Sequence, residues 1–137
     1  MTAGYSSTPL AKKLGIRPSS TVALLDAPSS FPSILRPSLP HEVDIRFDAR
    51  AIRDLFLVFA TRKARLRGRL RTALNRIPPD GMIWTAWPKK SSSIATDLAF
   101  DEVQALGLAA GLVDNKVGAI DDDWSALRFV IPLARRR

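Results

Sequence analysis

Basic and hydroxyl side chains follow an apolar strand near the middle of this chain. Residues 82–87 (Met-Ile-Trp-Thr-Ala-Trp) run into Pro88 and then into Lys89, Lys90 and Ser91. In an α/β protein, ligands bind beyond the C-terminal ends of the strands. Ammonium and hydroxyl groups at such a place favour an anion, and Trp87 would form an apolar wall beside it. The segment therefore predicts an anion site.

Two further segments would bring polar groups to the same edge of a sheet. One follows an expected strand at 21–26, and the other follows an expected strand at 54–60 and opens a basic helix. A helix N-terminus attracts anions, whereas cations there cost about 0.3–1 kcal/mol each, so a bound anion would offset that cost. The alternative is that these charged side chains are simply solvated. The candidate ligand-binding residues are Asp26, Ser29, Ser30, Thr61, Arg62, Lys63, Trp87, Lys89, Lys90 and Ser91.

Methyl transfer from S-adenosylmethionine is the enzymatic alternative. That cofactor needs a glycine-rich turn after the first strand and, typically, an acid at the end of the second. Here the turn is Ala27-Pro28-Ser29-Ser30, without glycine, and Asp48 is the acid that follows the second expected strand. We therefore expect a protein without catalysis and without a cofactor, and S-adenosylmethionine only under this alternative.

The positive charge is concentrated in one helix and one tail. The net charge is +8, with seven basic residues in the helix expected at 62–77 and three more at 135–137. Nucleic acid could lie along this helix, with phosphate contacts from Arg65, Arg67, Arg69 and Arg71. The helix has no interleaved exposed aromatic side chains for base stacking, so a solvated basic face is the competing interpretation.

Composition excludes several classes of site and partner. The chain has no cysteine, which removes disulfides and thiol chemistry. We expect its one histidine, His41, in a surface loop, and Asp121, Asp122 and Asp123 in a solvated turn. No apolar run reaches the roughly 20 residues that cross a bilayer, and the start lacks a signal-peptide pattern. We expect a cytoplasmic protein without a membrane partner; the sequence predicts no particular oligomeric state.

Hydrophobic periodicity places the candidate residues on an alternating α/β framework. Continuous apolar runs predict buried strands at 21–26, 54–60 and 82–87, and strict alternation predicts an edge strand at 42–47. Two closing strands at 113–120 and 126–133 are close enough for an antiparallel hairpin. We expect helices at 9–14, 33–36, 62–77 and 98–110, with Thr8 and Thr61 as caps of the first and third.

This alternation predicts one Rossmann-like α/β domain over residues 1–137, with three layers. Numbered along the chain, the strands should form a mostly parallel sheet of order 2-1-3-4-6-5, with flexible ends at 1–8 and 134–137. That layout looks like a reduced class I methyltransferase fold, although a fold does not imply a function. Strands 1 and 3 would meet at a topological switch point, the usual crevice for ligands.

Several motifs together resemble a family of small bacterial proteins, domain-of-unknown-function family 3052. They are Ala-Gly-Tyr-Ser-Ser-Thr-Pro-Leu-Ala-Lys-Lys-Leu-Gly-Ile at 3–16, Trp-Pro-Lys-Lys at 87–90, Thr-Asp-Leu at 96–98, Gly-Leu-Val-Asp-Asn-Lys-Val at 111–117 and Asp-Trp-Ser-Ala-Leu-Arg at 123–128. The resemblance covers nearly the whole chain and implies a Rossmann-like fold, without an activity to carry over. Where relatives often have a small residue and glycine near 29–31, this chain has Ser29-Ser30. We predict a basic binding or regulatory module whose partner is an anionic small molecule or a phosphate-bearing molecule.

Overall fold

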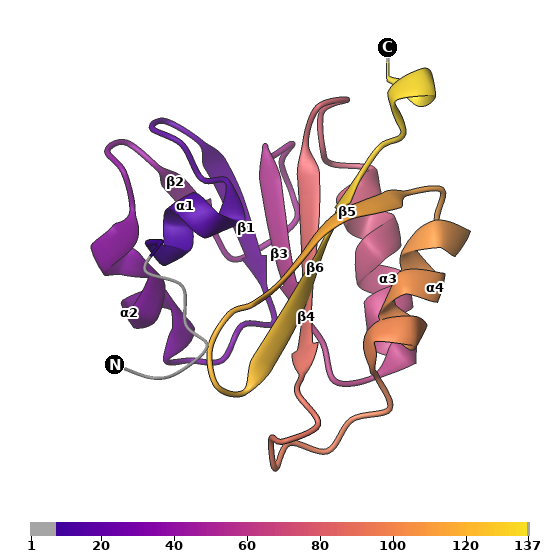
Figure 1. Cartoon of the computed structure of the whole chain (residues 1–137). Helices are drawn as coiled ribbons and strands as arrows, with labels where there is room; N and C mark the ends of the chain where they lie inside the picture. The colour runs from indigo at the N-terminus through magenta and orange to yellow at the C-terminus, as the bar shows by residue number, and fades with distance from the viewer. Residues whose placement is uncertain (1–7, 137) are drawn as a thin grey trace.

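A six-stranded mixed sheet forms the centre of the molecule (Figure 1). The computed structural model describes residues 8–136. The strand order β2-β1-β3-β4-β6-β5 confirms the predicted order. The first four strands in this order are parallel, and β6 is antiparallel to both of its neighbours. The strands are β1 (Thr21–Leu25), β2 (Asp44–Arg46), β3 (Leu55–Phe59), β4 (Met82–Pro88), β5 (Val113–Ala119) and β6 (Trp124–Val130).

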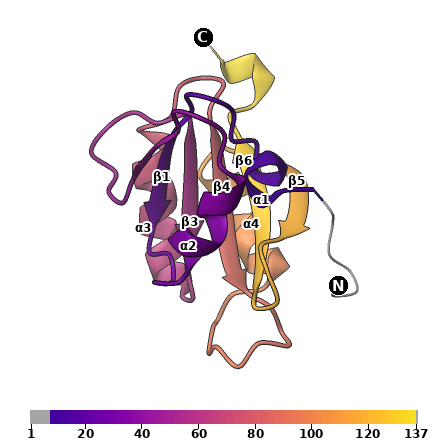
Figure 2. The same ribbon diagram turned by 90° about the vertical axis from the view of Figure 1, so that its left-hand side faces the viewer.

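Helices cover both faces of the sheet and make the expected three layers (Figures 1 and 2). One face carries α1 (Leu10–Leu14) and α2 (Phe31–Leu35), and the other carries α3 (Lys63–Leu74) and α4 (Phe100–Ala109). Short 3₁₀ helices lie at Arg36–Ser38 and Leu133–Arg135. Among the described residues, no helix has the length and apolar character that a membrane span requires.

The alternation of side chains along the strands divides the hydrophobic core into two parts. Ile83 and Trp87 belong to the part beneath α3 and α4, whereas Trp84 belongs to the part beneath α1 and α2. Every residue of β3 is buried, as expected of a parallel strand covered on both faces. Trp84 donates its indole N–H to the carbonyl of Leu14 at 2.8 Å and so ties α1 to the sheet.

The second strand is much shorter than the alternation at 42–47 predicts. Backbone pairing is limited to Asp44–Arg46, and Arg46 lies level with Ala23, two residues before β1 ends. The chain then returns toward the start of β3 without a helix, and the amide of Arg53 donates to the carbonyl of Arg76 at 2.8 Å. This strand therefore stops short of the edge at which β1 and β3 end.

The longest helix is also shorter than its apolar spacing predicts. It begins at Lys63 and ends at Leu74, where the amide of Arg76 turns back to the carbonyl of Ala73. The predicted caps are wrong, because neither Thr8 nor Thr61 is the N-cap: Pro9 precedes α1 and Arg62 precedes α3. The expected flexible end at 1–8 lies, except for Thr8, outside the described residues, as does Arg137 of the expected flexible tail.

Candidate functional site

A crevice opens between the C-terminal ends of β1 and β3, at the predicted switch point. It encloses about 200 Å³ and is lined by Asp26, Phe59, Ala60, Thr61, Arg65 and Trp124. We call these six residues the Asp26 crevice. Trp124 is buried and packs edge-to-face on Phe59, with ring centroids 5.0 Å apart. The hairpin tryptophan thus packs back on the sheet and forms one wall.

Two arginines of α3 hold the carboxylate of Asp26. Arg69 donates from Nε and Nη2 at 2.9 and 3.0 Å, and Arg65 donates from the same two atoms at 3.2 and 3.0 Å. These arginines are four residues apart and so lie on one face of the helix. Bidentate guanidinium–carboxylate pairs are the strongest geometry available to these groups. Because one carboxylate meets two guanidinium groups, the cluster keeps a surplus positive charge.

The environment of Asp26 makes its carboxyl group a stronger acid. The hydrogen bond from Arg69 is the largest influence; it outweighs partial burial and, with help from Arg65, lowers the pKa of Asp26 from 3.8 to about 2. Asp26 also has a positive φ of 60°, a conformation that aspartate tolerates better than most side chains. The carboxylate is therefore ionised and fixed against α3 at neutral pH.

The start of α3 is not the open anion site that the sequence predicts. The Asp97 carboxylate accepts the amide hydrogen of Lys63 at 2.8 Å, and the Thr96 hydroxyl donates to the carbonyl of Thr61 at 2.7 Å. An acid of the chain itself thus satisfies the helix N-terminus. Arg62 and Lys63 are exposed to solvent, which agrees with the alternative that these cations are solvated.

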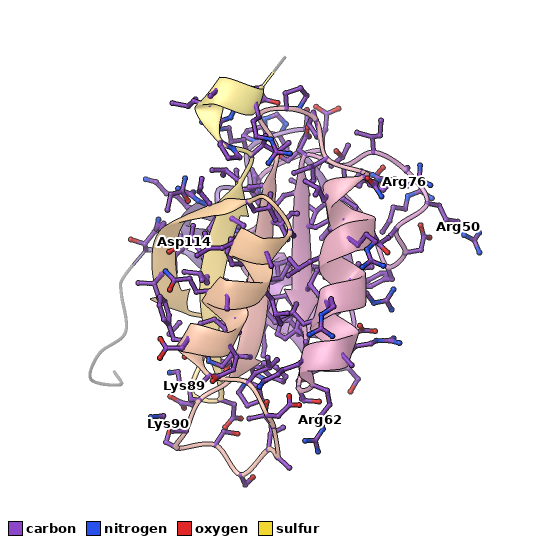
Figure 3. All side chains as sticks on the ribbon, turned by 90° about the vertical axis from the view of Figure 1, so that its right-hand side faces the viewer. Arg50, Arg62, Arg76, Lys89, Lys90 and Asp114 are labelled. Atoms are coloured by element: carbon purple, nitrogen blue, oxygen red, sulfur yellow. The ribbon has the colours of Figure 1, made fainter. Side chains whose placement is uncertain are left out.

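The basic loop after β4 does not join the Asp26 crevice. Trp87 is buried and faces Phe100 of α4, so it belongs to the core and is not a ligand wall. The amide of Lys89 donates to the carbonyl of Asp123 at 2.8 Å, and Lys90 and Ser91 are exposed. Figure 3 shows Lys89, Lys90 and Arg62 at one end of the molecule. None of these residues lines the crevice.

The turn after β1 is closed by its own backbone hydrogen bond, and its two serines take no part in the crevice. The amide of Phe31 donates to the carbonyl of Pro28 at 2.9 Å, which tightens the turn into α2. Ser29 and Ser30 are exposed and do not line the crevice. Of the ten candidate residues, the structure places only Asp26 and Thr61 in the lining.

The acid expected after the second strand lies away from the crevice. Asp48 is exposed and accepts the amide hydrogen of Arg50 at 3.0 Å. Figure 3 shows Arg50 and Arg76 toward the C-terminal end of α3, whereas Arg62 lies at the opposite end of that helix. The short β2 explains this displacement, because the chain leaves the sheet before it reaches the edge.

The arginines proposed for nucleic acid divide into two groups. Arg65 and Arg69 are paired with Asp26, whereas Arg67 and Arg71 line a groove of about 260 Å³ between α3 and α4, with Leu74, Leu106, Ala109 and Ala110. The basic face of the helix is thus partly neutralised.

The contact of Asp26 with Arg65 and Arg69 is not expected from the sequence, which assigns Asp26 to the ligand site and the two arginines to nucleic-acid binding. The i, i+4 spacing of Arg65 and Arg69 shows that they share a face of the helix. The contact with Asp26 is not predictable from local patterns, because the two arginines are 39 and 43 residues from it in the chain.

The simpler expectations for histidine and the acidic turn are confirmed. The side chain of His41 is 73% exposed, and its ring lies 3.4 Å from the carboxylate of the next residue, Glu42. Asp121 accepts amide hydrogens from Asp123 and Trp124 and so shapes the hairpin turn. Within residues 8–136, no cluster of three His, Asp or Glu side chains is arranged to hold a metal ion.

The fold is that of S-adenosylmethionine-dependent methyltransferases. The chain is similar to a SAM-dependent methyltransferase from Aquifex aeolicus, with a TM-score of 0.66 and 11% identity over 90% of this chain and 88% of that one. It is also similar to the pyocyanin biosynthetic protein PhzM, with a TM-score of 0.65, 11% identity and coverage of 90% of this chain and 53% of that one. The O-methyltransferase NcsB1 from neocarzinostatin biosynthesis, solved with S-adenosyl-L-homocysteine, gives a TM-score of 0.63 at 11% identity, over 82% and 49% of the two chains. No protein-family model and no curated protein matches the chain.

Proposed function

We propose that this protein is a methyltransferase-fold binding module that recognises a small anion at the Asp26 crevice and catalyses no reaction. The observation that carries the proposal is the pair of guanidinium groups that converges on Asp26 beside the crevice. Two arginines in a fixed bidentate arrangement are suited to a carboxylate or a phosphate. Asp26 then acts as an internal anion that a ligand displaces or joins.

The size and charge of the crevice support a small ligand. Its volume of about 200 Å³ falls below the roughly 300–1,000 Å³ of pockets that enclose drug-sized molecules. Phe59, Ala60 and Trp124 form its apolar walls. An inorganic phosphate or a short carboxylate fits this space and complements the surplus positive charge of the cluster.

The residues do not fit S-adenosylmethionine as it would be held at this edge of the sheet. The turn after β1 carries side chains at all four positions and is closed by its own hydrogen bond. The carboxylate of Asp26 is already bound to two arginines, and Asp48 does not line the crevice. Methyl transfer therefore remains the second candidate, and the methyltransferase neighbours in fold are the observation that favours it.

A titration with inorganic phosphate at constant ionic strength tests the main proposal. We expect the wild-type protein to bind phosphate, and Arg65→Ala/Arg69→Ala to lose binding. Removing the internal competitor with Asp26→Asn should tighten binding by about fivefold, the upper range for one exposed ion pair. Calorimetry or amide chemical shifts would measure the affinities.

The control variant Arg67→Ala/Arg71→Ala removes the same charge from the same helix but spares the crevice. Equal loss of affinity in both double variants would contradict a site at Asp26 and would favour general attraction of anions to α3. A parallel titration with S-adenosylmethionine separates the second candidate. The proposal would be overturned in favour of a methyltransferase if the protein bound S-adenosylmethionine more tightly than phosphate and lost that binding in the Asp26→Asn variant.

A further inference from the structure

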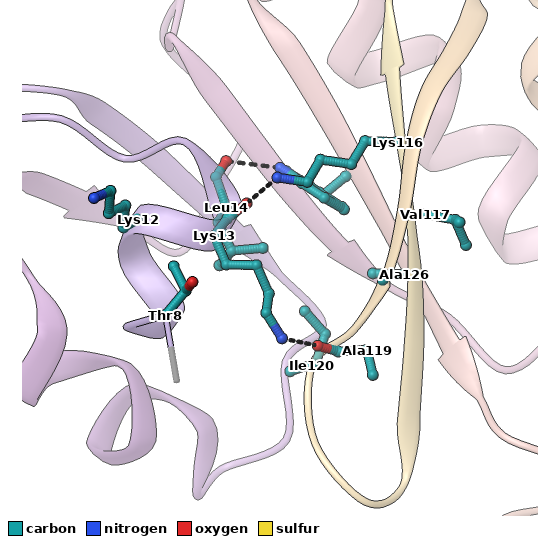
Figure 4. A pocket seen from close by; sticks show the side chains of 11 residues that line it. Thr8, Lys12, Lys13, Leu14, Lys116, Val117, Ala119, Ile120 and Ala126 are labelled. Atoms are coloured by element: carbon teal, nitrogen blue, oxygen red, sulfur yellow. Dashed lines mark hydrogen bonds between the residues drawn. The ribbon is translucent and has the colours of Figure 1, made fainter. Parts of the chain in front are cut away.

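A larger cavity lies on the face of the sheet that α1 and α2 cover, between α1 and the strand β5 (Figure 4). It encloses about 360 Å³, within the range of small-molecule sites. Neither the predicted site nor the proposed function involves it. We call it the lysine pocket; its described lining comprises Thr8, Lys12, Lys13, Leu14, Trp84, Lys116, Val117, Gly118, Ala119, Ile120 and Ala126.

The floor of the lysine pocket is apolar and rigid. Leu14, Trp84 and Ala126 are almost completely buried. The only polar atom of the Trp84 ring is already bound to the carbonyl of Leu14, and with 1% of the residue exposed the ring closes the bottom of the pocket. The guanidinium of Arg128 lies 5.7 Å from the centre of this ring, which fixes the ring further. The bottom of the pocket is therefore apolar and preformed.

The rim of the lysine pocket is positively charged. Lys13 donates to the carbonyl of Ala119 at 3.1 Å, and Lys116 donates to the carbonyl of Lys13 at 3.4 Å (Figure 4). Each ammonium group has three N–H donors, so these bonds leave capacity for a ligand. Lys12 also lines the pocket, and its side chain extends away from Lys13 and Lys116 (Figure 4). Among the described lining residues, no side chain carries a negative charge.

The one acid at the adjoining cavity is committed to the protein backbone. That cavity shares Thr8, Lys13, Ala119 and Ile120 with the lysine pocket and ends at Asp121. The carboxylate of Asp121 accepts amide hydrogens from Asp123 at 2.8 Å and Trp124 at 3.0 Å. The lysines therefore set the sign of the charge at the mouth of the pocket.

We infer that the lysine pocket binds a small organic anion with a flat apolar body, such as an aryl carboxylate. The apolar body occupies the cavity above Leu14 and Trp84, and the carboxylate faces Lys13 and Lys116. Two chain segments about a hundred residues apart supply these groups, so the pocket exists only in the folded domain. This site is independent of the Asp26 crevice.

The test compares 2-naphthoate with its uncharged analogue 2-naphthalenemethanol, by calorimetry on the full chain. We expect naphthoate to bind about fivefold or more tightly than the alcohol, because the lysines act on the carboxylate alone. Absence of naphthoate binding up to millimolar concentration, or equal affinity for the two compounds, would overturn the inference.

A pocket-filling variant tests the location. Gly118 lines the cavity, and a Cβ atom built there meets no atom within 4 Å, so Gly118→Leu can fill the cavity without a backbone clash. We expect it to abolish naphthoate binding while the melting temperature stays close to wild type. Gly68→Leu, at another uncrowded glycine far from the pocket, is the matched control and should bind normally. Unchanged binding in Gly118→Leu would contradict the assignment.

A charge variant tests the role of the lysines. Lys13→Gln/Lys116→Gln should weaken naphthoate binding by about three- to tenfold. Lys89→Gln/Lys90→Gln changes the net charge equally but lies in the loop after β4, and should leave the affinity unchanged. An equal loss in both double variants would mean that only the overall charge attracts the ligand, against a built site.

Discussion

One carboxylate organises the basic side of this protein at the scale of single residues. Asp26 joins β1 to α3 through two arginines, and its side chain is 28% exposed. Exposed ion pairs contribute little to stability, but a bidentate pair shared by two guanidinium groups is better ordered than an isolated one. The same contacts lower the pKa of Asp26 to about 2.

That low pKa predicts how the contribution of Asp26 to stability depends on pH. The folded state holds the proton less tightly than the unfolded state, where the carboxyl titrates near 3.8, so stability rises with pH between the two values. The ion pairs should contribute fully above about pH 4 and lose their contribution as the pH falls through about 2. Urea unfolding of the wild type and Asp26→Asn should show a difference at pH 6 that shrinks toward pH 2.

The control for this measurement is Asp80→Asn, which alters an exposed carboxylate in the turn before β4. Its difference from the wild type should stay small throughout. If the wild type exceeded Asp26→Asn in free energy of unfolding by as much at pH 2 as at pH 6, the ionised carboxylate would not be the cause of the difference.

At the scale of elements, contact between α4 and β6 depends on one glycine. A Cβ atom at Gly107 would lie 2.0 Å from the ring of Phe129, which is itself completely buried. Gly107→Ala should therefore lower the free energy of unfolding by about 1–3 kcal/mol through overpacking, although alanine favours helices. Chemical denaturation measures this change.

Gly68 on α3 provides the opposite case for the same substitution. Nothing lies within 4 Å of a Cβ atom there, so Gly68→Ala should raise stability by up to about 1 kcal/mol through helix propensity alone. If the two alanine variants changed stability in the same direction, close helix–strand contact at Gly107 would not be the cause.

The elements themselves were largely predictable from the sequence. Continuous apolar runs identified β1, β3 and β4, and the short acidic connection identified the β5–β6 hairpin, so the strand order followed from connection rules. The length of β2 was not predictable, because alternation at 42–47 continues beyond the backbone pairing. Hydrophobic periodicity indicates which face of the sheet a residue occupies, but it does not indicate where backbone pairing with the neighbouring strand ends.

The candidate site was less predictable than the fold, because its decisive contacts join distant segments. The chain separations are 34 residues for the Asp97 cap on α3 and 39 and 43 residues for the pairs with Asp26. Local patterns correctly placed Asp26 and Thr61 at the edge of the sheet but could not show that acids of the chain occupy the expected anion positions. The role of Trp87 was equally ambiguous, because a tryptophan near the end of a strand can line a ligand site or pack in the core.

At the scale of the whole molecule, the net charge of +8 opposes compaction. On α3, Lys63, Arg67 and Arg71 are spaced four residues apart, so like charges are neighbours. Raising NaCl from 20 to 300 mM should therefore raise the melting temperature, by about 3 °C for each roughly 1 kcal/mol of relieved repulsion. Scanning calorimetry or fluorescence measures the midpoint.

Arg67→Ala/Arg71→Ala should show a smaller increase with salt, because two of the repelling charges are gone. A melting temperature that falls with added salt would mean that favourable ion pairs, and not repulsion, dominate the electrostatics of the fold. The same comparison informs the nucleic-acid hypothesis, which requires these two arginines to be available to phosphates.

The position of β5 at the end of the sheet has a consequence for self-association. Within the described residues no further strand pairs with its outer edge, where Val117 is 61% exposed, and such an edge can template a strand from another molecule. The pairing of β5 with β6 shifts register between Asp114 and Lys116, and Lys116 adds a charge next to this irregularity. A bulge and a lysine are two devices that make an edge a poor template, so β5 protects this sheet against edge-to-edge aggregation.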